Sequence, residues 1–174
     1  VYDGGTSATG ATLTGTVQGA VSGDTLSLDT TAATLSYDSA HVATATAINA
    51  AGTLGFNVTA SNQASALSDY RFTAPTVPSA TASITPATLT PQLTNTGVTK
   101  TYDGTTAAPS GFTPTFSFTG LVNGDTSAAL TRTSTAYDST HAGQATKVVV
   151  SGLSLASISG NNSSATSDYA PVSY

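Results

Sequence analysis

The sequence repeats itself at a spacing of about 100 residues, and this repeat limits what the chain can fold into. Four short motifs recur in the same order, separated by 99 to 101 residues. They are Tyr2-Asp3-Gly4 and Tyr102-Asp103-Gly104, residues 19–25 and 120–126, residues 37–41 and 137–141, and Ser68-Asp69-Tyr70 and Ser167-Asp168-Tyr169. Collinear matches at one spacing indicate two copies of one folding unit. We therefore expect two modules, residues 1–76 and residues 77–174.

The two copies differ in what precedes their first motif. Residues 84–98 lead into Tyr102, and the sequence has no matching segment before Tyr2. Leu89 and Leu93 are four residues apart, so in a strand they share a face. We expect this segment to supply a first strand that module 1 lacks, as in a window cut from a longer array. An open sheet edge accepts a further strand, so we also expect neighbouring repeats, or a second molecule joined head to tail by strand donation, as partners.

Short runs in which apolar and polar residues alternate predict an all-β fold. The runs are residues 26–28, 116–118 and 148–155. Within the last run we expect Gly152 to form a bulge. Turn signals at residues 22–24 and 123–125 separate such runs, as in a β-sandwich. We expect two tandem immunoglobulin-like β-sandwich modules of roughly six to eight strands each. A proline-containing linker over residues 73–90 would join them and stiffen the junction.

Composition excludes several classes of partner. The chain has only 4 basic residues and a net charge of −5, so it cannot form the basic surface that nucleic acids require. No apolar run approaches the roughly 18 residues of a membrane span, so we expect no membrane insertion. The absence of cysteine removes disulfides, thiolate metal sites and thiol nucleophiles.

Polar residues at repeated positions are the candidate sites. All nine acidic residues are aspartates, and eight of them pair between the copies. Aspartate in loops binds calcium or anchors turns through its side chain, and we interpret these residues as turn and loop anchors, with no cofactor expected and calcium as the alternative. The anchors are Asp38, His41, Asp138, His141, Asp69, Tyr70, Asp168 and Tyr169. We expect no metal site at His41 or His141, because the sequence contains neither cysteine nor glutamate to complete one. We expect no catalysis by them either, because an aspartate two or three residues before a histidine is not a triad.

The Tyr-Asp-Gly motifs have two readings. Asp-Gly predicts a turn with positive φ at Gly4 and Gly104, which makes the motif a structural one. The alternative is that Tyr2 and Tyr102, with loop aspartates, form an aromatic platform for sugars. We prefer the first reading, because a tyrosine beside a turn commonly packs its ring and hydrogen-bonds its hydroxyl.

The second copy resembles the YDG domain, a repeat of large bacterial adhesins of the filamentous-haemagglutinin type. The resemblance lies in residues 84–89, 100–106, 120–125, 141–143, 147–153 and 168–169. His141 departs from the family pattern, which usually has asparagine there. The resemblance implies a β-rich stalk module of an exported surface protein, and it implies no enzymatic residue.

Three functions follow from these observations. The first is a non-catalytic stalk or filament repeat of an extracellular or cell-surface adhesin, serving adhesion or biofilm architecture. The second is a lectin-like module that binds glycans through loop Tyr and Asp residues. The third, a glycosidase, requires two carboxylates across a cleft, and nothing in the sequence marks one. We therefore expect no enzyme activity.

Overall fold

The computed structural model describes residues 1–61, 64–122, 124–160 and 163–170. These residues contain eleven β-strands, two short 3-10 turns and no α-helix, which confirms the all-β prediction. None of the helical turns described is long and apolar enough to cross a membrane. Contacts divide the chain into two compact units: unit 1 contains Val1–Gly4, His41–Ala43 and Ile84–Tyr174, and unit 2 contains Gly5–Ala40 and Thr44–Ser83.

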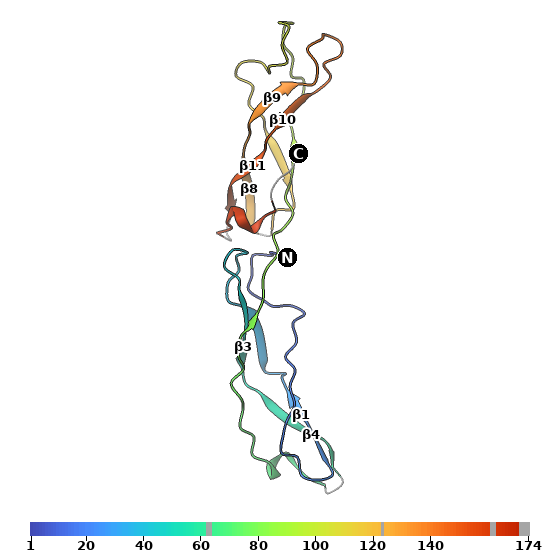
Figure 1. The fold of residues 1–174 in the computed structure, drawn as a ribbon, viewed down its shortest axis with the longest axis vertical. Helices are drawn as coiled ribbons and strands as arrows, with labels where there is room; N and C mark the ends of the chain where they lie inside the picture. Colours follow the sequence, from blue (N-terminus) through green and yellow to red (C-terminus); the bar gives the residue numbers. More distant parts are fainter. Residues whose placement is uncertain (62–63, 123, 161–162, 171–174) are drawn as a thin grey trace. The chain divides into compact units, whose positions relative to one another are not determined.

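Unit 2 is built on a long antiparallel ribbon (Figure 1). Its strands are β1 (Asp24–Asp29), β2 (Ala33–Tyr37), β3 (Ala47–Gly52), β4 (Gly55–Ser61) and β5 (Ala80–Thr81). β1 pairs with β4 and β2 pairs with β3. Since Asp29 lies opposite Gly55 and Ala33 lies opposite Gly52, the two pairs follow one another as one ribbon. β5 then adds to the edge of β3.

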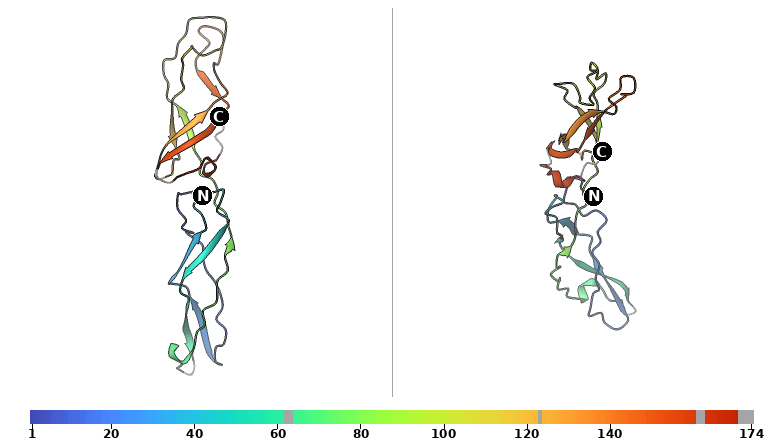
Figure 2. Two further views of the ribbon diagram at one scale, coloured as in Figure 1. Left: turned by 90° about the vertical axis from the view of Figure 1, so that its left-hand side faces the viewer. Right: turned by 45° about the horizontal axis from the view of Figure 1, so that its top comes forward.

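Unit 1 contains a second ribbon of the same topology, which Figure 2 shows from two further sides. Its strands are β6 (Thr90–Leu93), β7 (Phe116–Thr119), β8 (Asp125–Thr131), β9 (Ser134–Tyr137), β10 (Val148–Ser151) and β11 (Ser154–Gly160). β8 pairs with β11 and β9 with β10, so that Thr131 lies opposite Ser154 and Ser134 opposite Ser151. β6 and β7 form a separate antiparallel pair. In the described part of unit 2, no strand pair corresponds to β6 and β7.

Both units have small apolar cores. In unit 1, Val150 and Leu153 are buried, and Leu93, Phe116 and Leu130 pack against them. This cluster joins the β6–β7 pair to the ribbon, because its members come from both. In unit 2, the Phe56 ring lies 5.2 Å from Phe72 and 6.0 Å from Tyr70. Because few apolar side chains are buried, hydrogen bonds in the loops contribute much of what holds the loops and strands in place.

Gly152 does not form the expected bulge inside a single strand. The run 148–155 is divided there into β10 and β11, and Gly152 has φ 65°. A Cβ at this position would lie 2.1 Å from Oγ1 of Thr133, so only glycine fits. The register shifts of this ribbon lie further along, at Leu155/Ser157 and Ser159/Gly160. Asn123 of the expected turn at 123–125 lies outside the described residues.

The segment expected as a linker, residues 73–90, takes part in both units. Ala80–Thr81 form β5 on the edge of β3. Ile84, Ala87 and Leu89 are buried in unit 1, with exposures of 7%, 6% and 4%. These three buried side chains anchor this part of the chain in unit 1.

Candidate functional site

Each ribbon begins at a tyrosine–aspartate corner. In unit 1 the Tyr169 hydroxyl donates to the Asp125 carboxylate and accepts from the Val122 N–H at 2.9 Å. In unit 2 Tyr70 makes the same two contacts with Asp24 and Val21. Burial and the nearby Asp125 carboxylate raise the pKa of Tyr169 from 10.0 to about 12. The repeated tyrosines therefore hold the turn that leads into β1 or β8.

A second aspartate closes the other end of each ribbon. Asp38 accepts from the Thr46 N–H at 2.9 Å and from its hydroxyl at 2.7 Å. Asp138 accepts the same two bonds from Thr146, at 2.9 and 2.8 Å. The threonine side-chain hydrogen bond is the first cause that lowers the pKa of each carboxyl. These contacts fix the start and end of the loops that carry His41 and His141.

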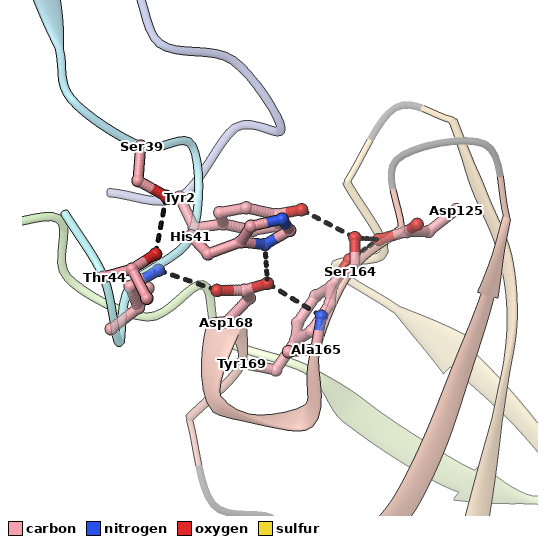
Figure 3. A network of polar contacts seen from close by, with 10 residues as sticks. Tyr2, Ser39, His41, Thr44, Asp125, Ser164, Ala165, Asp168 and Tyr169 are labelled. Carbon is pink, nitrogen blue, oxygen red and sulfur yellow. Dashed lines mark hydrogen bonds and ion pairs between the residues drawn. The ribbon is translucent and has the colours of Figure 1, made fainter.

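Asp168 is the most buried polar residue of unit 1 and lies at the centre of a network (Figure 3). Its side chain has no exposure, and one carboxylate oxygen lies 2.7 Å from Nδ1 of His41. The other oxygen accepts from the Val42 N–H at 2.7 Å. Asp168 also accepts from the Ala165 N–H at 2.8 Å. Burial raises the pKa of Asp168, but the bonds from His41, Ala165 and Val42 outweigh it, and the pKa lies below its ordinary value.

Tyr2 continues the network from the beginning of the chain. Its ring is 3% exposed and lies edge-on to the Tyr169 ring, at 5.8 Å between centroids. The Tyr2 hydroxyl lies 2.6 Å from Ser164 Oγ, and Ser164 donates to Asp125 at 2.7 Å. Burial is the main reason that the pKa of Tyr2 is raised. Four of the predicted positions, Tyr2, His41, Asp168 and Tyr169, are thus brought together inside unit 1 (Figure 3).

The residue types here resemble those of a catalytic triad, but their connections differ. A triad serine gives its proton to the histidine, and an aspartate orients that histidine. His41 and Asp168 are paired, whereas the Ser164 hydroxyl donates to Asp125. These hydrogen bonds hold together four segments that are separate in the sequence, those at Tyr2, at residues 41–42, at Asp125 and at residues 164–169. Among the described residues, no group of three His, Cys, Asp or Glu side chains is placed to hold a metal ion.

The second Tyr-Asp-Gly motif lies at a different surface of unit 1. Gly104 has φ 74°, and Gly4 has φ 81°. Lys100 Nζ lies 2.7 Å from Asp103, and the Thr105 N–H donates to the same carboxylate at 2.9 Å. The Lys100 bond is the first cause that lowers the pKa of Asp103 to about 2. Tyr102 is 63% exposed.

Tyr102 borders a hollow of about 250 Å³ that is also lined by Lys100, Tyr137 and His141. Asp69 lies outside this hollow and outside the network around Asp168, and accepts from the Ala66 N–H at 2.8 Å in unit 2. Asp3, the remaining predicted position, follows Tyr2 in the chain and belongs to unit 1. The predicted residues therefore occupy several places rather than one.

Sequence reasoning missed the residues that complete the corners. Ser164, Thr46 and Thr146 were not singled out, although each makes a side-chain bond to a repeated aspartate. The signal that could have found them is the repeat itself, since Thr46 and Thr146 are 100 residues apart. Ser65 and Ser164 are 99 apart, and Ser65 bonds Asp24 much as Ser164 bonds Asp125.

Part of the chain matches a known protein family. Residues 85–170 match the YDG domain, which confirms the resemblance for this segment. The matched segment contains strands β6 to β11, the exposed Tyr102 and the buried Asp168. No curated protein and no solved structure matches the chain.

Proposed function

We propose that this chain, whose residues 85–170 form a YDG domain, is a non-catalytic stalk or filament repeat of an extracellular bacterial surface adhesin. The observation that carries the proposal is the use of the repeated polar residues. At the same positions in both copies, Asp and Tyr side chains bond backbone or side-chain groups of their own fold. Side chains that bond within their own module fix the geometry of that module. A stalk requires such a fixed geometry, because its modules stack one on the next.

The matched contacts extend through both ribbons. The Tyr37 N–H donates to Thr6 O at 2.7 Å, and the Tyr137 N–H donates to Thr106 O at the same distance. The 3-10 turns are capped alike, by Ala66 to Asp69 in one copy and by Ala165 to Asp168 in the other. Two copies with the same internal bonds favour a repeat whose geometry is reproduced from one module to the next.

We further propose that each copy is a reduced immunoglobulin-like sandwich. In unit 1 the β6–β7 pair packs on the ribbon through Leu93 and Phe116, which gives two layers over Val150. The strand pairs are short, so the layers are narrow. In this proposal unit 1 contributes both layers, and a copy without a β6–β7 pair takes its second layer from a neighbouring repeat.

Neighbouring repeats are the proposed partners. In unit 1 the segment before β6 pairs in parallel with the end of the repeat: Ala87 donates to Asp168 O at 2.9 Å and accepts from Ala170 at 2.8 Å. The equivalent edge of the first copy is at Tyr70. We propose that the edge takes a strand of this kind from another repeat. A peptide of residues 84–93 should then slow hydrogen exchange at Arg71, and unchanged exchange would contradict strand donation.

We propose that the module works without a metal. The repeated aspartates accept hydrogen bonds from Thr, Tyr and backbone groups of their own fold. Oδ1 of Asp24 and Oδ1 of Asp125 are buried without a hydrogen-bond partner, but no group of three His, Cys, Asp or Glu side chains among the described residues could hold a metal ion. Thermal unfolding in EDTA and in calcium tests this. A change in Tm below about 5 °C is expected, since a specific calcium site would raise Tm by more.

The alternative function is glycan binding, and the exposed hollow at Tyr102 favours it. An exposed tyrosine beside Lys100 and His141 offers an aromatic face and polar groups. A glycan array separates the two functions. The stalk proposal expects no binding by the 174-residue chain. Binding that the Tyr102→Ala variant abolishes would instead establish a lectin.

A further inference from the structure

Four repeated positions differ sharply in exposure between the copies. Tyr2 is 3% exposed and Tyr102 is 63% exposed. Asp168 and Tyr169 are buried, whereas Asp69 is exposed and Tyr70 is half-buried. His41 is half-buried and His141 is exposed. The buried members of these pairs are the ones that meet one another in the network of unit 1.

The buried contact is thus made by two surfaces of the repeat. One surface, the head, consists of the Tyr-Asp-Gly tyrosine and the histidine loop, here Tyr2 and His41–Ala43. The other, the tail, consists of the 3-10 turn that ends in Ser-Asp-Tyr, here Thr166–Tyr169. The head comes from the first sequence copy and the tail from the second, and both belong to unit 1. Each copy therefore has one head and one tail. The head of the first copy contacts the tail of the second copy, whereas the head of the second copy and the tail of the first are exposed.

The exposed tail of the first copy has the same backbone conformation as the buried tail of the second copy. The turn Leu67–Asp69 and the turn Thr166–Asp168 are both 3-10 helices followed by a tyrosine at φ −115° and ψ 145°. In both, the aspartate accepts from the N–H three residues earlier at 2.8 Å. The Asp69 carboxylate is therefore already held in the orientation in which Asp168 meets its histidine.

The unused head is also held in place. The His141 N–H donates to Ser139 Oγ at 3.1 Å, and the Gln144 and Ala145 N–H groups donate to His141 O. Tyr102 and His141 line the same hollow, which leaves both accessible. Ala142 follows His141 as Val42 follows His41, so its N–H corresponds to the Val42 N–H that donates to Asp168.

We propose that a second copy of this chain docks its Leu67–Tyr70 tail onto the Tyr102 and His141 head of the first. Asp69 would accept from His141 and from the Ala142 N–H, as Asp168 does from His41 and Val42. This inference deepens the proposed stalk function and rests on it, because it names the partner of the repeat. The contact joins unlike surfaces, so it leaves a free head and tail at the two ends and propagates into a filament.

Two properties of the surfaces fit this partner. Leu67, 51% exposed on the tail, and Tyr102, 63% exposed on the head, are two of the large apolar side chains that the described chain leaves exposed. Their contact would remove both from water. The tail carries the Asp69 carboxylate as an acceptor, and the head carries the His141 ring and the Ala142 N–H as donors, so the polar groups of the two surfaces are complementary.

NMR titration of the full chain tests the docking. An ¹⁵N-labelled chain at low concentration is mixed with unlabelled chain up to roughly millimolar concentration, since contacts formed between linked modules can be this weak between separate molecules. Amide shifts are expected at Tyr102, His141 and Ala142 and also at Leu67–Tyr70. With unlabelled Asp69→Lys, the head shifts should disappear and the tail shifts should remain. With unlabelled Tyr102→Ala, the pattern should be reversed.

A cysteine experiment provides a second measurement, because the chain has no native cysteine. His141→Cys is mixed with Asp69→Cys in a glutathione buffer, and the control mixture contains His141→Cys with Thr53→Cys, another exposed position. The first mixture should yield about tenfold more mixed dimer than the control.

Two results would overturn the docking. The first is an equal yield of mixed dimer in the test and control mixtures together with no amide shifts in the titration. The second is amide shifts at Tyr102, His141 and Ala142 that remain when the unlabelled chain carries Asp69→Lys. The glycan array separates this failure from failure of the stalk proposal. No glycan binding and no docking would leave the stalk standing without this contact. Glycan binding through Tyr102 would remove the stalk function, whatever the titration shows.

Discussion

Asp69 and Asp168 show how one residue type at one repeat position can have two different roles. Both cap a 3-10 turn, but only Asp168 has no exposure and bonds a histidine. A buried carboxylate is stable only when hydrogen bonds replace its water, and His41 and two N–H groups do so. Its pKa is lowered, so its contribution to stability is present above the ordinary pKa near 3.8 and is lost as pH falls through the lowered value.

Replacement of Asp168 should therefore destabilise unit 1 far more than replacement of Asp69 destabilises unit 2. Asp168→Ala leaves the Val42 and Ala165 N–H groups without their acceptor, and we expect a loss of about 2–4 kcal/mol in the free energy of unfolding. Asp69→Ala, the matched control, should cost under about 1 kcal/mol, because water replaces the lost bond. Native-state hydrogen exchange of each unit measures both values. Equal losses would show that the network around Asp168 contributes nothing beyond the cap.

The Asp103 carboxyl should titrate at about pH 2, against 3.8 for an unperturbed group. Its pKa is depressed, so any stability it contributes is complete above pH 3.8 and disappears as pH falls through about 2. In Lys100→Ala the NMR titration midpoint should move up toward 3.8, because the Lys100 bond is the first cause of the shift. The midpoint of Asp138, which Thr146 lowers, should stay in place. An unchanged Asp103 midpoint would mean that the ion pair does not form in solution.

At the scale of elements, each ribbon is closed at both ends by aspartate side chains. Asp38 and Asp138 bond the threonine at the start of the returning strand, and Asp24 and Asp125 accept from the corner tyrosines. Strand pairs this narrow bury few apolar groups, so the end contacts limit fraying. Glycines between the elements constrain the fold in another way. Several of them have positive φ, and at some of them a Cβ would lie too close to backbone atoms.

Two of these glycines should respond differently to the same substitution. Both have positive φ, 92° at Gly120 and 74° at Gly104, so alanine costs about 1–2 kcal/mol at either position. A Cβ at Gly120 would also lie 2.1 Å from the Thr88 carbonyl oxygen, whereas a Cβ at Gly104 meets nothing within 4 Å. We expect Gly120→Ala to destabilise unit 1 by about 2–4 kcal/mol in all. Urea denaturation of the two variants compares them, and equal midpoints would show that the Thr88 segment moves away freely.

For the whole molecule, the sequence predicts the repeat, the all-β fold and the resemblance of the second copy to the YDG domain, and the match at residues 85–170 confirms that resemblance for this segment. These follow from short-range patterns: alternation in residues 26–28 and 116–118, and motifs with fixed spacing. What it does not predict is that Ile84, Ala87 and Leu89 are buried or that Tyr2 reaches Ser164. Contacts over such separations depend on how the ribbons and loops fold in three dimensions, and no local pattern in the sequence encodes them.

Unit 1 is completed by the four residues at the beginning of the chain. The Tyr2 N–H donates to Thr85 O at 2.8 Å, its hydroxyl bonds Ser164, and its ring is 3% exposed. Removing residues 1–4 should therefore cost unit 1 about 3 kcal/mol, from the lost burial of one tyrosine and two hydrogen bonds.

Hydrogen exchange should show this loss at Ala87 and Ala170, whose backbone bonds hold the segment before β6. Strands β2 and β3 of unit 2 should keep their protection, since the deletion touches none of their pairing. Tyr2→Ala should reproduce most of the effect, because Tyr2 makes the hydroxyl and ring contacts, and Tyr102→Ala, its exposed counterpart, should cost under about 0.5 kcal/mol. If the deletion loosens both units equally, or neither, then residues 1–4 do not contribute specifically to unit 1, and its stability depends on His41–Ala43 and residues 84–170.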